Sequence, residues 1–183
     1  MKSDSFPAQE ELTFGLTGYF AKTIFPLEVW GRQQTITAET PVLWEKDNYF
    51  LLVRSGCGRI YVNQIEWNIR RGALLCLGPF HAYRIEPDPG ETLDILEAHI
   101  NNGAYLYVLA CPYIKIHKML IPNLPATVQL SLEDTQIAEA TLLDYLRVSS
   151  PDCMNHKLCF LYIMELFGLL LSNEKRSQFP FNH

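Results

Sequence analysis

Two histidines and a glutamate fall within one short stretch, residues 72–103, whose pattern is that of three strands joined by turns. His81 follows the turn at residues 78–79, and Glu97 and His99 lie two residues apart in the last strand. Imidazole nitrogens and carboxylate oxygens bind catalytic metals, exchange protons in acid–base catalysis and hydrogen-bond to polar ligands. The trio therefore suggests a metal site, an acid–base pair or the polar wall of a ligand pocket.

The parity of the last strand indicates which way these side chains point. Alternate residues of a strand share a face, so Ile95, Glu97 and His99 point the same way. The residues between them are apolar and suit packing against helices: Leu96, Ala98 and Ile100. We therefore expect the first set to face the interior of a barrel, and by the same parity His81 and Tyr83 share a face of the preceding strand.

A buried glutamate beside a histidine is costly unless it is paired or solvated, and a polar ligand would relieve that cost. Tyr83, His99 and Glu97 among aliphatic walls suit a small polyhydroxylated or aromatic molecule. The alternatives are that Glu97 and His99 form a structural pair, or that a bulge reverses the parity.

Short strands in the first 130 residues predict a mainly β sandwich or barrel. Gly- and Pro-containing turns separate the candidate strands, and the pair Asn63-Gln64 marks a hairpin turn. No helix-length connection joins these strands, which argues against a parallel α/β sheet. The candidate strands are residues 18–24, 41–45, 48–58, 59–69, 73–77, 81–86 and 92–100.

Two helices are expected after residue 130. Ser131 is a favourable N-cap, with Asp134 placed for a weak capping box, and apolar residues follow at helical spacing. The second helix is expected to follow Ser150-Pro151 and to run to about Glu174. It is apolar nearly all round from residue 158 to 171, so one face needs a partner beyond the barrel. A second copy of the chain is the simplest partner, and the first helix is the alternative.

The order of these motifs resembles the sugar-sensing cupin domain at the N-terminus of AraC/XylS-type transcriptional regulators. The segment YFLLVRSGCGRIYVNQIEWNIRRGALLCLGPFHAYRI carries the family's glycine turn, hairpin, second glycine turn, proline turn and histidine, and LEAHINNG is similar to a later strand of the family. The similarity covers about residues 13–176. The residues that carry it are Gly56, Gly58, Gly72, Pro79, His81, His99 and Gly103.

This chain also departs from the family pattern. The proline turn is shorter, Glu97 stands where tryptophan is frequent, and the helix-turn-helix units that read DNA are absent from the sequence.

The resemblance implies a cupin-like double-stranded β-helix, a jelly-roll barrel, followed by two C-terminal α-helices. It implies a ligand-binding barrel with an N-terminal arm at residues 1–128, a helical dimerisation segment at 129–176, and the start of a linker to a DNA-binding domain at 177–183. The ligand contacts expected are Ser55, His81, Tyr83, Ile95, Glu97 and His99. The dimer contacts expected are Leu158, Leu161, Tyr162, Glu165, Leu166 and Leu169.

A metal is not expected. Metal-binding cupins use two histidines and a carboxylate before the turn glycine, and those slots fall at residues 43–45 and Tyr49, none of which is histidine. Only His81 matches the second metal motif, so three of four ligands are missing where a catalytic metal needs about three. A different triad of His81, Glu97 and His99 is the less favoured alternative.

Composition excludes several classes of function. The net charge is −5 with scattered basic residues, so this chain offers no surface for phosphate backbones. The apolar run at residues 158–171 is too short for a membrane span and contains Glu165. Five cysteines without a C-x-x-C motif, and no secretory signal, indicate a reducing cytoplasm.

The sequence therefore predicts a non-enzymatic sensing domain without a cofactor, which binds a small-molecule effector, forms a homodimer and reaches DNA only through a C-terminal domain. No nucleophile elbow, phosphate loop or dinucleotide fingerprint is present. One alternative is a stand-alone metal-free cupin enzyme, a sugar isomerase or epimerase that uses His81 or His99 with Glu97 as acid and base. Another is a structural dimer with a filled barrel.

Overall fold

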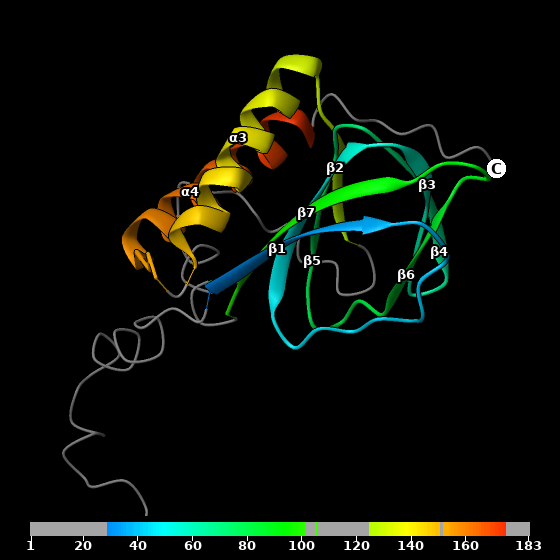
Figure 1. Cartoon of the computed structure of the whole chain (residues 1–183), viewed down its shortest axis with the longest axis horizontal. Helices are drawn as coiled ribbons and strands as arrows, with labels where there is room; N and C mark the ends of the chain where they lie inside the picture. Colours follow the sequence, from blue (N-terminus) through cyan, green and yellow to red (C-terminus); the bar gives the residue numbers. More distant parts are fainter. Residues whose placement is uncertain (1–28, 102–104, 106–124, 151, 175–183) are drawn as a thin grey trace, which may run out of the picture.

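The described part of the chain forms two antiparallel sheets and two helices in a computed structural model (Figure 1). The structure describes residues 29–101, 105, 125–150 and 152–174. The larger sheet has the order β1 (Val29–Ile36), β7 (Leu93–Ile100), β2 (Asn48–Ser55), β5 (Ala73–Leu77) and β8 (Ala126–Gln129). The smaller sheet has the order β4 (Ile65–Arg70), β3 (Cys57–Val62) and β6 (Tyr83–Pro87). The predicted mainly β class is confirmed.

Turn residues fix the register of the strands. Asn63 and Gln64 adopt positive φ angles of 49° and 71°, as a two-residue hairpin turn requires, and they join β3 to β4 as expected. Gly56 has φ of 85°, and a Cβ there would lie 1.9 Å from the carbonyl oxygen of Thr92. Only glycine fits this turn, through which the chain passes from the larger sheet to the smaller one.

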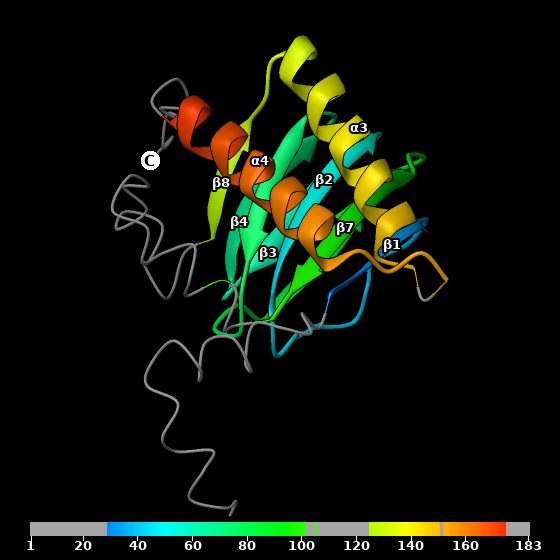
Figure 2. The same ribbon diagram turned by 90° about the vertical axis from the view of Figure 1, so that its left-hand side faces the viewer.

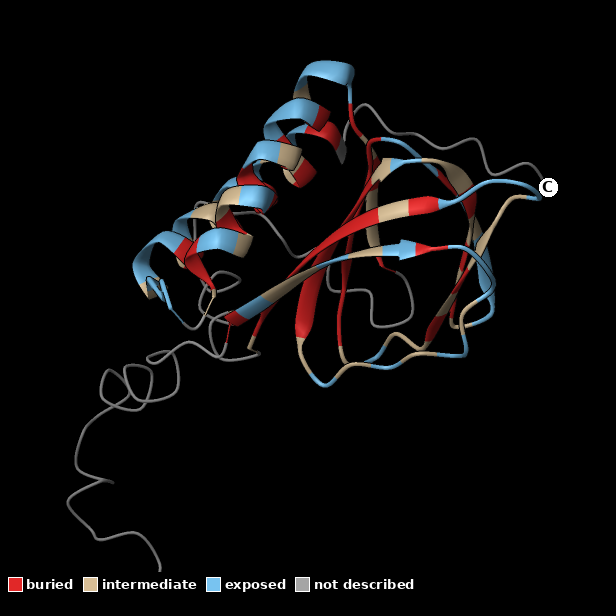
Figure 3. Ribbon diagram, in the orientation of Figure 1, coloured by how far each residue is buried: buried red, intermediate tan, exposed pale blue. Residues whose placement is uncertain are grey.

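The central strands of the larger sheet, β7, β2 and β5, are buried on both faces, so their side chains alternate between two cores (Figure 3). Leu96, Ala98 and Ile100 of β7 pack in the core beneath the helices, whereas Ile95 packs in the core between the sheets. The parity expected for β7 is therefore confirmed. Large side chains occupy the space between the sheets, among them Tyr49, Leu51, Ile60, Leu75, Tyr83 and Ile85.

The helices α3 (Leu132–Val148) and α4 (His156–Glu174) lie side by side across the outer face of the larger sheet (Figure 2). Ser131 caps α3, because its hydroxyl oxygen accepts a hydrogen bond of 3.1 Å from the Asp134 amide. The expected start of α4 is wrong. The helix begins at His156, where the Asn155 side chain accepts a bond of 3.2 Å from the Leu158 amide, while the Ser150 hydroxyl bonds back to Arg147 in α3.

A close approach at Gly31 brings α3 onto the sheet. A Cβ at Gly31 would lie 2.6 Å from Leu146 Cδ2 and 2.8 Å from the carbonyl oxygen of Glu97. Any larger residue would push α3 away from β1 and β7.

Some elements differ from those expected. Residues 41–45 form no strand, and only Leu43 makes an isolated bridge, to Tyr83. The strands β1 and β8 were not anticipated, since neither VWGRQQTI nor ATVQ shows an apolar alternation. The predicted strand at 18–24 and the predicted linker at 177–183 lie outside the described residues.

Candidate functional site

His99, near the end of β7, lies at one end of the barrel. His99 pairs with Trp30 of β1 on one side and with Tyr49 of β2 on the other. Tyr83 bridges to Leu43 at the same end. We call this end, formed by residues 29–30, 41–49, 78–83 and 99–101, the barrel mouth. Antiparallel pairing alone gathers these residues, which lie up to about seventy positions apart.

The buried carboxylate of Glu97 is saturated by side chains of its own chain. It is fully buried, and Oε2 accepts a hydrogen bond of 2.5 Å from Arg32 Nε. Oε1 accepts one of 2.7 Å from Gln34 Nε2, and His99 Nε2 lies 3.3 Å from Oε2. Burial alone would lower the pKa of Arg32, but the hydrogen bond and the charge of Glu97 raise that pKa overall. The cost of burying Glu97 is therefore offset within the protein.

His99 is held between two aromatic rings. Its ring centroid is 3.4 Å from that of Trp30 and 4.6 Å from that of Tyr49, and both pairs are nearly parallel. Trp30 is 39% exposed, whereas His99 and Tyr49 are each only 1% exposed. Trp30 and the half-buried Arg32 thus form the solvent-facing wall of the site. We call the group of side chains in contact here the mouth cluster, or the cluster: Trp30, Arg32, Tyr49, Tyr83, Glu97 and His99.

Three buried polar atoms of this cluster lack a well-formed hydrogen bond within the described residues. They are Tyr49 Oη, Tyr83 Oη and His99 Nδ1. The two tyrosine rings lie 5.8 Å apart, and their hydroxyls are near enough to interact. Burial, followed by Tyr83 and Glu97, raises the pKa of Tyr49 well above its ordinary value. Burial also raises the pKa of Tyr83 to about 12, so both phenols stay protonated at neutral pH.

Unpaired buried polar atoms are rare in native proteins, and each needs an explanation such as a bound water or a ligand. Here they comprise two neutral hydroxyl groups and one imidazole nitrogen beside flat aromatic surfaces. Such a set can hydrogen-bond and stack on an uncharged polar molecule.

The cluster is bonded directly to helix α3. The Tyr145 hydroxyl donates a hydrogen bond to the main-chain carbonyl of His99, and Tyr145 is fully buried. From α3 the Thr141 hydroxyl donates a 2.9 Å bond to Glu165 of α4. A displacement of the His99 main chain would therefore strain the hydrogen bonds that connect β7 to α3 and α3 to α4.

The structure brings together four of the predicted ligand contacts. Tyr83, Glu97 and His99 meet in the cluster, and Ile95 lies one step deeper in the core between the sheets. Ser55 does not join them. It is exposed at the opposite end of β2, opposite Asp94 after a break in register. This position follows from the eight-residue length of β2.

His81 has a local role in the turn before β6. Its Nδ1 accepts a 2.9 Å hydrogen bond from the Gly78 amide, and its own amide bonds to the Gly78 carbonyl. These bonds fasten the Gly78–Pro79 turn. In the described ranges no three histidine, cysteine, aspartate or glutamate side chains come together in a way that could hold a metal ion.

Sequence reasoning missed Trp30, Arg32, Gln34 and Tyr49. The first three alternate along β1, and pairing places Trp30 opposite His99 and Arg32 opposite Glu97. The alternation of large polar and aromatic residues in VWGRQQTI was the available signal. This alternation does not by itself predict a strand, because polar residues lie on the inner face of β1 where apolar ones would be expected.

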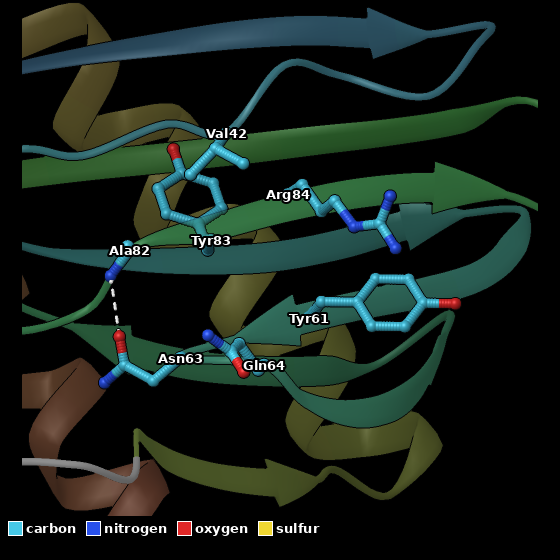
Figure 4. A pocket seen from close by; sticks show the side chains of 7 residues that line it. All are labelled: Val42, Tyr61, Asn63, Gln64, Ala82, Tyr83 and Arg84. Carbon is cyan, nitrogen blue, oxygen red and sulfur yellow. Dashed lines mark hydrogen bonds between the residues drawn. The ribbon is translucent and has the colours of Figure 1, made fainter.

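A groove is lined by residues of the smaller sheet and of the adjoining barrel mouth (Figure 4). This groove has a volume of about 600 Å³. The guanidinium of Arg84 lies 4.2 Å from the centre of the Tyr61 ring and pairs with Glu39. Asn63 bonds to the Ala82 amide and to the Phe80 carbonyl. Arg84 and Asn63 are thus paired within the protein, whereas the Tyr83 hydroxyl, at the border of the groove and the mouth, has no well-formed hydrogen bond among the described residues. The groove is lined by Val42, Tyr61, Asn63, Gln64, Ala82, Tyr83 and Arg84.

The expected dimer contacts fall on both faces of α4. Leu158 and Leu161 are 37% and 60% exposed, and Glu165 is exposed as well. Leu166 is fully buried in the core of its own chain, so a second copy could reach it only if α4 moved. Tyr162 and Leu169 are half-buried. No helix in the described part of the chain is long and apolar enough to cross a membrane.

Comparison with solved structures places this fold beside a bacterial regulator. The structure of ToxT from Vibrio cholerae O395 bound to (E)-4-(8-methylnaphthalen-1-yl)but-3-enoic acid aligns over 82% of this chain and 57% of that chain, with a TM-score of 0.53 and 14% identity. Wild-type ToxT from strain SCE256 with bound unsaturated fatty acid aligns over 82% of this chain and 55% of that one, with a TM-score of 0.50 and 13% identity.

ToxT is an AraC-family regulator with an N-terminal cupin-like domain. The fold implied by the sequence resemblance is thus confirmed. This chain spans somewhat more than half of the length of ToxT. A cupin protein from Bacteroides fragilis aligns over 42% of this chain with a TM-score of 0.36 and 18% identity, which is too partial for further argument. No protein-family model and no curated protein matches the sequence.

Proposed function

We propose that this chain is the effector-sensing and dimerisation domain of an AraC-like DNA-binding transcriptional regulator, and that a small sugar-like or aromatic molecule binds at the barrel mouth. The observation that carries this proposal is a group of buried polar atoms at the mouth, Tyr49 Oη, Tyr83 Oη and His99 Nδ1, which have no well-formed hydrogen bond to any described residue. A ligand that pairs with these atoms would repay the cost of burying them. The fold shared with ToxT, whose structures hold (E)-4-(8-methylnaphthalen-1-yl)but-3-enoic acid or an unsaturated fatty acid, supports ligand binding by this fold and says nothing of the ligand class of this chain.

Binding would act on the helices through the main chain of β7. A ligand that displaces Trp30 or shifts the His99 ring alters the carbonyl to which Tyr145 of α3 is bonded. The Thr141–Glu165 bond passes the change to α4. A ligand that prefers one arrangement shifts the population towards it. In a dimer this shift would alter the spacing of two DNA-binding units carried by another part of the protein.

Ligand binding is tested with Trp30 as a fluorescent reporter in a Trp44→Phe/Trp67→Phe background. Neutral metabolites that raise the melting temperature should also change the Trp30 emission, because the ring covers His99. Tyr83→Phe should weaken this binding. The matched control is Tyr61→Phe on the adjacent strand, whose hydroxyl bonds to Glu86 on the outer face. Equal effects of the two variants would place the ligand elsewhere.

Dimerisation is tested by substitutions on the two faces of α4. We expect the parent chain to have twice the mass of 21.0 kDa in solution, and Leu161→Asp to halve that mass while keeping the helical signal. Gln136→Asp on the exposed side of α3 is the control. A monomeric parent, or a dimer that persists in Leu161→Asp, would contradict an interface on this face of α4.

The enzymatic alternative is disfavoured by the engagement of Glu97. Both of its oxygens accept hydrogen bonds from side chains of the same chain, which leaves it poorly placed to exchange a proton with a substrate. Turnover of a sugar that disappears in Glu97→Gln would revive the isomerase alternative.

A further inference from the structure

The bonding of Glu97 determines which nitrogen of the His99 ring carries hydrogen. In a neutral imidazole one nitrogen donates and the other accepts, and the hydrogen bond made by one nitrogen selects the role of the other. Glu97 Oε2 also accepts from Arg32, and the carboxylate can only accept. The His99 nitrogen beside it, Nε2, must therefore carry the hydrogen.

The other nitrogen of the ring, Nδ1, is then a bare acceptor. It is buried, without a hydrogen-bond partner in the described part of the chain. Stacking against Trp30 and Tyr49 prevents the ring from tilting to find a partner elsewhere. The Tyr49 and Tyr83 hydroxyls can donate or accept, so Nδ1 is the one atom of the three with a fixed requirement.

We propose that Glu97 is a positioning residue that fixes His99 in the Nε2–H tautomer, so that the mouth selects an uncharged ligand presenting an O–H or N–H donor to Nδ1. The ligand part rests on the function proposed above, whereas the tautomer does not. Glu97, first expected to touch the ligand, acts instead through His99. A carboxylate ligand has no donor for Nδ1 and would leave that nitrogen unpaired.

The tautomer is read directly by long-range ¹H–¹⁵N correlation spectra of the histidine rings in the ligand-free full chain. Under conditions in which the His99 ring is neutral, Nδ1 should resonate as a pyridine-type nitrogen and Nε2 as a pyrrole-type nitrogen. The His99→Gln spectrum assigns the signals by their loss. A pyrrole-type Nδ1 in the unmodified chain would overturn the proposal without any variant.

Substitution of Glu97 then tests its control over His99. In Glu97→Gln the amide can donate to Nε2, so the spectrum should shift wholly or partly to the Nδ1–H form. Asp94→Asn makes the same change from carboxylate to amide on the same strand, where Asp94 pairs with Arg54, and should leave the His99 signals unmoved. An unchanged tautomer in folded Glu97→Gln would refute the positioning role.

Matched fragments test the ligand class: benzyl alcohol, benzyl methyl ether and benzoate. Benzyl alcohol should move the His99 signals at about fivefold lower concentration than the ether, as expected for one neutral hydrogen bond, and at lower concentration than benzoate. Equal or tighter binding of the ether or of benzoate would overturn the ligand class. If none of the fragments binds while the tautomer is as stated, the ligand class and the proposed effector site both fail, and the role of Glu97 stands.

Discussion

Replacing the two mouth tyrosines by phenylalanine should stabilise the fold while it removes ligand binding. Tyr49 and Tyr83 are each 1% exposed, and neither hydroxyl has a well-formed hydrogen bond within the described residues. Burying an unpaired hydroxyl costs about 1–3 kcal/mol by protein mutational data. The double variant removes both hydroxyls, so neither is left alone when its neighbour is lost. Because the two hydroxyls interact with each other, we expect a net gain of about 1 kcal/mol.

The matched comparison is Tyr145→Phe, the same chemical change at another fully buried tyrosine. Its hydroxyl is bonded to the His99 carbonyl, so the substitution removes a hydrogen bond from the core. We expect a loss of about 1–2 kcal/mol. The two substitutions should thus have opposite signs in urea unfolding, each kcal/mol shifting the melting temperature by about 2–4 °C in a domain of this size. A double variant that loses as much stability as Tyr145→Phe would refute the claim that the mouth hydroxyls are unsatisfied.

Three further substitutions and one pH titration test the same geometry. Arg32→Leu leaves the fully buried Glu97 carboxylate without its cation, so the free energy of unfolding should fall by about 2 kcal/mol. The control is Arg147→Leu, which breaks an exposed pair with Asp144 and should change the free energy of unfolding by less than about 0.5 kcal/mol. Gly31→Val should push α3 away from the sheet and lower the melting temperature by several degrees, because even a Cβ at this position would lie 2.6 Å from Leu146 Cδ2. An unchanged melting temperature would contradict this close approach. Leu166→Asp should prevent folding altogether, in contrast to exposed Leu161→Asp, as read by circular dichroism. The folded-state pKa of Tyr83, about 12 against an ordinary value of 10, means that the unfolded chain loses this proton first. Stability should therefore fall as the pH rises from about 10 to 12, and less steeply in the double phenylalanine variant; identical alkaline unfolding curves would argue against the raised pKa.

Glutamate and histidine at the mouth illustrate how far sequence reasoning reaches. The two-residue period of a strand placed Glu97 and His99 on the inner face of β7, and the structure confirms that parity. The two-residue repeat does not reveal which partners each side chain has on that inner face. Glu97 looked like a ligand contact until its partners Arg32 and Gln34 were placed beside it by pairing with β1.

The local backbone features, namely two turns and one helix cap, could be predicted from the sequence. The glycine at 56, the hairpin pair Asn63-Gln64 and the cap at Ser131 each follow from steric limits on a few neighbouring residues. The start of α4 was misjudged, because two competing caps lie within six residues, and Ser150 is drawn back to the end of α3.

Only the tertiary structure decided how the site is assembled. Trp30 stacks on His99 across 69 positions of sequence, and Ser55, on the same strand as Tyr49, is sent to the far end of the barrel. These outcomes depend on which strands pair and in which register, and register is set by the packing of both faces of the larger sheet at once. A strand such as β1, polar on the face that lines the mouth, acquires its position from its neighbour β7 rather than from its own pattern. The sequence thus determined the barrel and the inward face of β7. Long-range pairing then brought a saturated carboxylate, a stacked imidazole and two buried phenols together in one site.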